Sequence, residues 1–102
     1  MSIKKKYFKK KGICKVTFGV SESEDDPIRQ VHVVGEFNNW SRSATPMKRS
    51  NKGVFKVSLD LVPGQEYQFR YLLNDSRWVN DADADKAADT PYPDARNSVI
   101  AL

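Results

Sequence analysis

The chain of 102 residues has very few of the side chains that form disulfides or bind transition metals. It contains one cysteine, Cys14, and one histidine, His32. A single cysteine excludes an intramolecular disulfide and is consistent with a reducing compartment. No stretch approaches the roughly 20 apolar residues of a membrane helix. The lysine-rich start has no apolar segment after it, so we expect no secretory signal and a cytoplasmic protein.

The sequence also lacks the residue arrangements that catalysis requires. No serine lies in a Gly-x-Ser-x-Gly turn, and His32 has no partner at a spacing suited to nucleophilic catalysis or to metal binding. The acidic residues cluster at 22–26 and 81–89. In such loops we expect solvated carboxylates and not a pair held across a cleft with one raised pKa, as glycoside hydrolysis requires. We therefore predict a protein that is not an enzyme and needs no cofactor.

One acidic segment partly matches a calcium-binding loop. Asp81, Asp83 and Asp85 have the spacing of its first three ligands. Lys86 then replaces the glycine that this loop needs for its turn. We therefore predict an acidic surface loop and no metal site.

The positive charge is concentrated at the start of the chain. The net charge is +4, but residues 1–11 contain six lysines and no acid, so the other 91 residues hold 11 basic and 13 acidic side chains. We divide the chain into this basic segment, 1–11, and a β-domain at 12–102. The basic segment is either a solubilising arm or an edge strand that its lysines keep from self-pairing. Tyr7 and Phe8 lie among the lysines, so nucleic-acid binding stays open, although it would need basic residues spread over a face.

Alternation of apolar and polar residues predicts an all-β fold. Cys14 points inward on this pattern, and so do Val99 and Ala101, whereas Gln68 and Arg70 face away from the core. Turns are expected at 50–53 and 63–64, and 80–96 is the longest irregular segment. Together these features indicate an antiparallel β-sandwich of about seven strands. The predicted strands are 14–20, 28–36, 47–49, 55–61, 67–73, 77–79 and 97–102.

Four side chains have the chemistry of a sugar site. The apolar run at 31–34 breaks into a glycine- and asparagine-rich corner that places Trp40 at the margin of the sheet. Trp78 lies at another strand–turn margin, Arg70 projects from its strand, and Asn97 begins the last strand. Sugar rings present apolar faces and hydroxyls, which flat aromatics, a guanidinium and a carboxamide can bind. The alternative is that both tryptophans pack in the core between the sheets.

Three segments, 33–40, 67–71 with Trp78, and 97–99, resemble a known family. They are similar to the glycogen-binding domain of AMP-activated kinase β subunits and to the early-set domains at the N-termini of isoamylases and branching enzymes, carbohydrate-binding module family 48. The likeness runs from about residue 12 to 102, and the Gly-x-Phe-Asn-x-Trp corner at 35–40 is its most specific part. Small free-standing bacterial early-set proteins are the most similar members.

The resemblance implies an immunoglobulin-like β-sandwich that binds α-1,4-linked glucans. Carried over by position, Trp40 and Trp78 would stack on glucose rings, while Arg70 and Asn97 would hydrogen-bond the hydroxyls. Arg70 stands where the kinase domains usually have lysine, which keeps the charge but changes the donor geometry.

Our leading hypothesis is a non-catalytic module that binds glycogen, starch or maltooligosaccharide. The second is a scaffold domain that docks on a glycogen-metabolising or other enzyme through a sheet edge, without sugar. Exposure of the tryptophans separates the two: exposed rings favour sugar, and buried rings favour a protein partner. We expect no membrane association.

Overall fold

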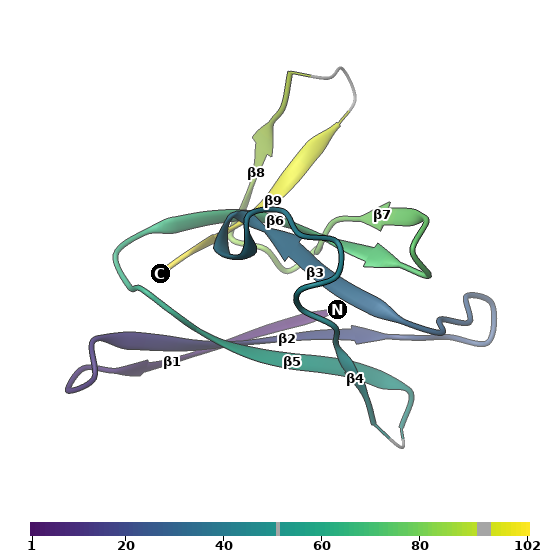
Figure 1. Cartoon of the computed structure of the whole chain (residues 1–102), viewed down its shortest axis with the longest axis horizontal. Coiled ribbons are helices and arrows are strands. Elements are labelled where there is room, and N and C mark those ends of the chain that lie inside the picture. Colours follow the sequence, from purple (N-terminus) through teal and green to yellow (C-terminus); the bar gives the residue numbers. More distant parts are fainter. Residues whose placement is uncertain (51, 92–94) are drawn as a thin grey trace.

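The alternating apolar side chains build two antiparallel sheets that pack face to face, as the computed structural model shows for residues 1–50, 52–91 and 95–102 (Figure 1). The first sheet has the order β1-β2-β5-β4, and the second has the order β3-β6-β9-β8, with β7 also paired to β6. The elements are β1 (Ser2–Phe8), β2 (Ile13–Ser21), β3 (Val31–Gly35), the 3₁₀ turn η1 (Glu36–Asn38), β4 (Lys48–Arg49), β5 (Val54–Leu61), β6 (Glu66–Leu73), β7 (Arg77–Val79), β8 (Lys86–Asp89) and β9 (Arg96–Ala101). The prediction of an all-β, immunoglobulin-like sandwich is confirmed.

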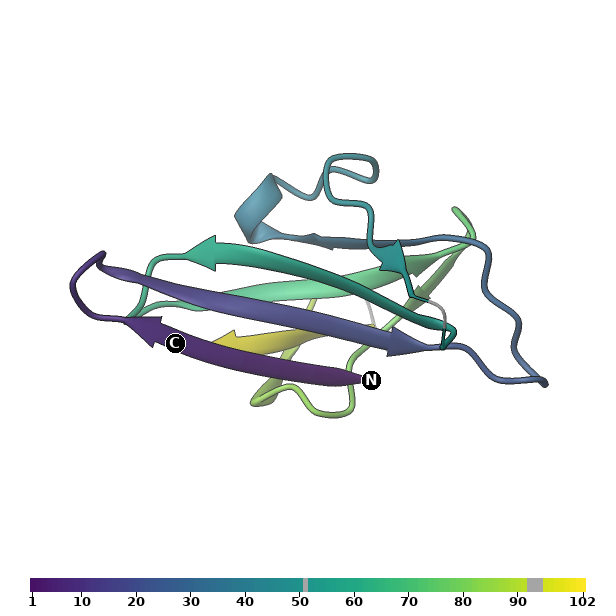
Figure 2. The same ribbon diagram turned by 90° about the horizontal axis from the view of Figure 1, so that it is seen from below.

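The core lies between the two sheets. Figure 2 looks onto the first sheet from below, with β6 and β9 of the second sheet behind it. Phe18 from β2 contacts Phe69 and Tyr71 from β6, with ring centroids 5.2 and 6.3 Å apart in edge-to-face geometry. Such pairs add about 0.5–1.5 kcal/mol each to the free energy of burial. Cys14 is fully buried in this core, which confirms its predicted inward position.

The basic segment at the N-terminus is an edge strand. Strand β1 pairs with β2 along its whole length, from Ser2 opposite Gly19 to Phe8 opposite Ile13. Lys5 points to the inner side of the sheet and reaches the second sheet, where its Nζ donates to Asp85 Oδ2 at 2.6 Å and to the carbonyl of Ala101 at 2.9 Å. The segment therefore connects the edges of the two sheets.

The structure corrects two predictions about the C-terminal part of the chain. Segment 80–96 is not irregular throughout, because 86–89 forms β8 and pairs with β9. The prediction that Val99 and Ala101 face the core is wrong by one residue. Ile100 lies opposite Tyr67, which packs against the core, and is itself fully buried in the core cluster, whereas Val99 lies opposite Gln68 on the outer side of the sheet.

The acidic segment 81–89 contacts the protein itself. Asp81 is buried and accepts a hydrogen bond from the Tyr71 hydroxyl at 2.6 Å. Asp85 pairs with Lys5, and Asp89 pairs with Arg96 at 3.0 Å. These carboxylates therefore point to different partners, and no group of three or more ligating residues is found in the described part of the chain. No helix among the described residues is long and apolar enough to cross a membrane.

Two turns complete the outline. The predicted turn at 63–64 is present, with Gly64 at a φ of +80°. The turn at 50–53 includes residue 51, and segment 80–96 includes residues 92–94, which lie outside the described residues. In the described part of the former turn, Gly53 has a φ of +71° and its N–H donates to the Ser50 carbonyl.

Candidate functional site

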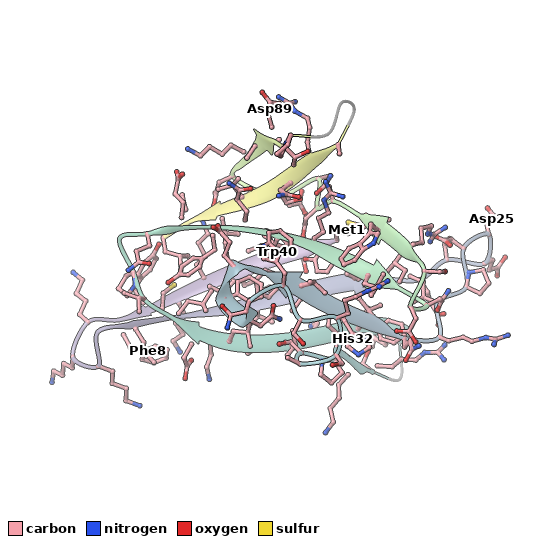
Figure 3. The ribbon with its side chains drawn as sticks, turned by 45° about the horizontal axis from the view of Figure 1, so that its top comes forward. Met1, Phe8, Asp25, His32, Trp40 and Asp89 are labelled. Carbon is pink, nitrogen blue, oxygen red and sulfur yellow. The ribbon has the colours of Figure 1, made fainter. Side chains whose placement is uncertain are left out.

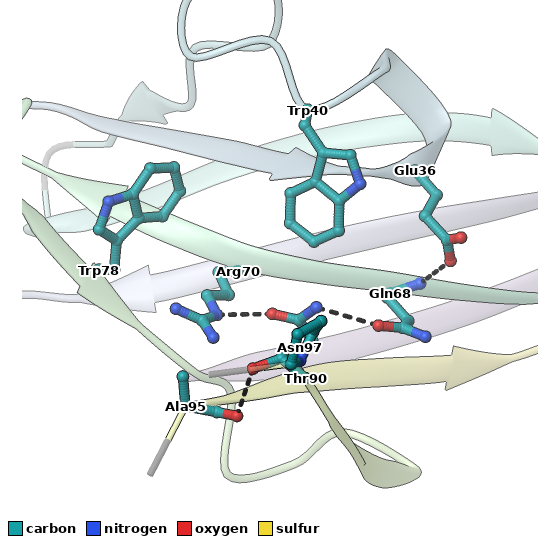
Figure 4. A pocket seen from close by; sticks show the side chains of 9 residues that line it. Glu36, Trp40, Gln68, Arg70, Trp78, Thr90, Ala95 and Asn97 are labelled. Atoms are coloured by element: carbon teal, nitrogen blue, oxygen red, sulfur yellow. Dashed lines mark hydrogen bonds between the residues drawn. The ribbon is translucent and has the colours of Figure 1, made fainter. Parts of the chain in front are cut away.

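A pocket of about 460 Å³ opens on the outer face of the second sheet (Figure 4). All four residues predicted from the sequence line it. Trp40 comes from the corner after β3, Arg70 from β6, Trp78 from β7 and Asn97 from β9. The fold thus brings together side chains that are up to 57 positions apart in the chain, since 97 − 40 = 57.

Asn38 holds the corner that presents Trp40. Its Oδ1 accepts the Gly35 N–H at 3.1 Å, and its Nδ2 donates to the Val33 carbonyl at 2.9 Å and to Thr45 Oγ1 at 3.0 Å. The carboxamide therefore joins the end of β3 to the loop that follows the corner.

The backbone of the corner turns sharply after Asn38. Asn39 and Trp40 both have positive φ angles, 57° and 58°, which asparagine tolerates and tryptophan rarely adopts. The Trp40 N–H donates to the Gly35 carbonyl at 2.8 Å, which closes the corner. As a result the indole points away from the core and over the sheet (Figure 3).

Gly35 and Glu36 fix the corner against β6. A Cβ on Gly35 would lie 2.5 Å from the Gln68 carbonyl oxygen and 2.7 Å from Phe69 Cβ, so only glycine fits without movement of this backbone. Strand β3 ends at Gly35, and the Glu36 carboxylate then accepts the Gln68 N–H at 2.6 Å. A side chain thus continues the hydrogen bonding of the sheet where the strand stops, and it does so at the wall of the pocket.

The two indoles lie on the outer side of the sheet and are partly open to solvent. Trp40 is 38% exposed and Trp78 is 39% exposed, and neither belongs to the core between the sheets. The guanidinium of Arg42 lies 5.6 Å from the centre of the Trp78 ring. The alternative that both tryptophans pack between the sheets is therefore wrong.

A row of hydrogen-bonded polar groups forms the floor beside the indoles. Arg70 Nε donates to Asn97 Oδ1 at 2.7 Å, and Asn97 Nδ2 donates to Gln68 Oε1 at 2.9 Å. These bonds fix the orientation of the Asn97 carboxamide. Both terminal nitrogens of Arg70 are free of hydrogen bonds and ion pairs with the described residues, so they can donate to a ligand.

The β8–β9 hairpin supplies the remaining wall through Thr90, Pro91 and Ala95. Thr90 Oγ1 donates to the Ala95 carbonyl at 2.8 Å and so joins the two arms near the tip of the hairpin. Figure 1 shows this hairpin projecting from the body of the sandwich. One wall of the pocket therefore comes from the segment that the sequence predicted as irregular.

Sequence reasoning missed Glu36 and Gln68 as pocket residues. Gln68 could have been found, because it precedes Arg70 by two positions in the same strand and therefore lies on the same face. Glu36 gives no such signal, since its position depends on the 3₁₀ turn that ends β3.

The fold and the site together define a class of protein: an immunoglobulin-like β-sandwich with an aromatic and polar binding pocket on one sheet face. Comparison with known proteins gives the family. The model for carbohydrate-binding module 48 (isoamylase N-terminal domain) matches residues 29–85, and the chain belongs to this family of non-catalytic carbohydrate-binding modules. The match contains Trp40, Arg70 and Trp78, whereas Asn97 lies beyond it.

Two relatives are much longer proteins. The 1,4-alpha-glucan-branching enzyme of Emericella nidulans is 41% identical over 56 residues, which cover 48% of this chain and 8% of the enzyme. Protein FLOURY ENDOSPERM 6, chloroplastic, of Oryza sativa subsp. japonica is 36% identical over 56 residues, which cover 55% of this chain and 10% of that protein. The similarity is thus confined to a small part of each relative.

Proposed function

We propose that this protein binds α-1,4-linked glucans, such as glycogen, starch or maltooligosaccharides, and catalyses no reaction on them. The observation that carries the proposal is the pairing of two partly exposed indoles with an ordered row of polar groups in one pocket. A neutral sugar polymer needs both features. Its apolar ring faces stack on aromatic rings, and its hydroxyls pair with fixed donors and acceptors.

In this proposal the tryptophans supply most of the affinity and the polar row supplies orientation. Trp40 and Trp78 would each stack on a glucose ring, contributing on the order of 1 kcal/mol beyond burial. The free nitrogens of Arg70 would donate to sugar hydroxyls, and Asn97 would hold the guanidinium in place. Two such stacking contacts give only a weak complex, with a dissociation constant of roughly micromolar to millimolar.

The test is a calorimetric titration of the protein with maltoheptaose. Trp40→Ala and Trp78→Ala should each weaken binding about tenfold or more, if each loses about 1.4 kcal/mol. Tyr7→Ala is the matched control, because Tyr7 is an exposed aromatic on β1, in the other sheet. This control should bind as the wild type does. No heat at millimolar sugar would refute the proposal, and full binding by both tryptophan variants would show that the site lies elsewhere.

Two variants of Arg70 test the polar row. Arg70→Ala should weaken binding, because it removes the donors and leaves Asn97 Oδ1 without its partner. Arg70→Lys keeps the charge but has no planar fork, so its affinity should lie between those of Arg70→Ala and the wild type. Equal affinity for all three proteins would exclude a role for the guanidinium.

Docking on a partner enzyme without sugar is the alternative. The exposure of both indoles supports the sugar proposal. Docking through a sheet edge would instead be expected with buried indoles and an apolar edge strand open to solvent.

The proposed absence of catalysis has its own test. Incubation with soluble glycogen should release no reducing ends, as expected for a module that binds without cleaving.

A further inference from the structure

Lysines collect on the outer face of the first sheet, opposite to the pocket. In β2 the apolar residues Cys14, Val16 and Phe18 are buried, so Lys15 and Thr17, which alternate with them, point outward. The pairing register extends this assignment across the sheet, because residues directly opposite each other share a face. The outward lysines are Lys4 and Lys6 of β1, Lys15 of β2, Lys48 of β4 and Lys56 of β5.

The register arranges these side chains in three rows that cross the strands. The first row contains Gly19 of β2, Lys56 of β5 and Lys48 of β4, so its two lysines lie at the β4 side of the sheet. The middle row has Lys4, Thr17 and Ser58 in order. The third row consists of Lys6, Lys15 and Asp60. Successive rows are about 7 Å apart, since outward residues alternate along a strand with a rise of about 3.4 Å per residue.

None of the five lysines of this face forms an ion pair with a described residue, although Asp60 lies opposite Lys15. Lys4, Lys15, Lys48 and Lys56 have no hydrogen bond or ion pair with the described residues, and Lys6 Nζ lies over the Phe8 ring at 5.3 Å. Asp60 is the one acidic residue among the outward positions that the structure describes on these strands.

Two of the contacts on this face are unfavourable for folding. Lys6 lies opposite Lys15, and Lys48 lies opposite Lys56. Like charges directly opposite each other destabilise a sheet. The arrangement therefore does not serve stability, and it leaves a concentrated positive field on one side of the sandwich.

The face also has a depression of about 500 Å³ on its β4–β5 side. Lys48, Lys56 and the hydroxyl residues Thr17 and Ser58 line it, together with the apolar Pro46 and Val57. The two hydroxyl oxygens are 2.8 Å apart and share one hydrogen bond. Because one of the two hydroxyl protons is used in this bond, the pair keeps one O–H that can be donated to a bound group. Phosphate oxygens accept hydrogen bonds from ammonium and hydroxyl groups of this kind.

We propose that this lysine face binds the phosphodiester backbone of nucleic acid, without sequence preference. A backbone is a ridge of regularly spaced charges, which can enter the depression and meet the three rows in turn. A protein partner fits poorly, because lysine is depleted in the cores of protein interfaces and the face has no exposed aromatic at its centre. A membrane surface is flat and could not reach the hydroxyls in the depression.

This inference does not depend on glucan binding. The pocket lies on the outer face of the second sheet, so the two ligands would occupy opposite sides of the sandwich. The acidic loop around Asp25 lies at one end of the molecule, far from Phe8 and the β1–β2 turn at the other end (Figure 3). An anionic polymer can thus approach the β1–β2 turn end of the lysine face away from these negative charges.

The test is fluorescence anisotropy of a labelled single-stranded oligonucleotide of mixed sequence, at several salt concentrations. If all five lysines contact phosphates, the logarithm of the affinity should fall against the logarithm of salt with a slope of about −3.5, from about −0.7 per contact. The face variant carries Lys4→Gln, Lys6→Gln, Lys15→Gln and Lys56→Gln. It should bind roughly tenfold more weakly, or worse, at low salt, with a slope near −0.7.

A control variant removes the same charge from outside the face. It carries Lys9→Gln, Lys10→Gln, Arg29→Gln and Lys52→Gln, all outside the strands. Near wild-type affinity and slope for this control, with the loss confined to the face variant, would support the proposal. Equal losses in both variants would overturn it, because binding would then follow net charge and not the face. No binding by the wild type at low salt would also overturn it, and so would binding to phosphatidylserine vesicles without binding to the oligonucleotide. Circular dichroism spectra check that both variants are folded.

Discussion

The Asn38 side chain should contribute more to the free energy of unfolding than any other single polar group of the corner. Replacing it by alanine removes three hydrogen bonds, to the Gly35 N–H, the Val33 carbonyl and Thr45 Oγ1. Each bond contributes about 0.5–1.5 kcal/mol net, and the site is only partly buried, so Asn38→Ala should lower the free energy of unfolding by about 2–3 kcal/mol. Because the same bonds hold the backbone that carries Trp40, the folded variant should also bind maltoheptaose more weakly.

The assay is urea denaturation followed by circular dichroism, with Asn39→Gly as the matched control. The Asn39 side chain makes no hydrogen bond with a described residue, and its φ of +57° suits glycine equally well. The control should therefore stay within about 0.5 kcal/mol of the wild type. If Asn38→Ala also stayed within that limit, the hydrogen bonds of its carboxamide would not be what stabilises the corner.

Three further predictions concern other parts of the fold. Gly35→Ala should destabilise the protein by about 1–3 kcal/mol in urea, because the new Cβ overlaps the β6 backbone; an unchanged midpoint would contradict this. Tyr71→Phe should cost about 1.5–3 kcal/mol, because it leaves Oδ2 of the buried Asp81 carboxylate without its donor while Oδ1 keeps the Asp83 N–H; an unaltered melting curve would argue against the Tyr71 bond. Burial tends to raise the pKa of Asp85, but hydrogen bonds from Lys5 and a backbone N–H lower the pKa overall. The ionised carboxylate therefore stabilises the folded protein above about pH 4, and this contribution is lost as the pH falls further. Asp85→Asn should accordingly flatten the acid side of a plot of stability against pH, and a curve as steep as that of the wild type would exclude this contribution.

The sandwich could be predicted where one face of a strand is apolar and the other polar. Strands β2, β5 and β6 meet that condition, and the structure places Cys14 inward and Gln68 and Arg70 outward, as predicted. The rule failed where both faces are covered. In β9, Val99 and Ile100 are both buried, so alternation could not tell which one faces the core. Strand β8 has the sequence Lys-Ala-Ala-Asp, which has little strand propensity, and it forms because it pairs with β9.

The site was predictable in its side chains but not in its full outline. Trp40, Arg70, Trp78 and Asn97 carry recognisable chemistry, and the structure places all four around one pocket. The β8–β9 wall was missed because it depends on a hairpin that local sequence does not encode. Neither could the sequence show the lysine face, since its members come from four strands and only the register aligns them.

The most direct test of the central claim uses the fact that the chain has only two tryptophans. In a ¹H–¹⁵N spectrum their indole N–H groups give two separate signals, which single alanine variants can assign. Stacking of a glucose ring on each indole predicts that both signals shift together as maltoheptaose is added, with one shared dissociation constant. Signals that stay in place at millimolar maltoheptaose, while the protein is folded, would contradict the account.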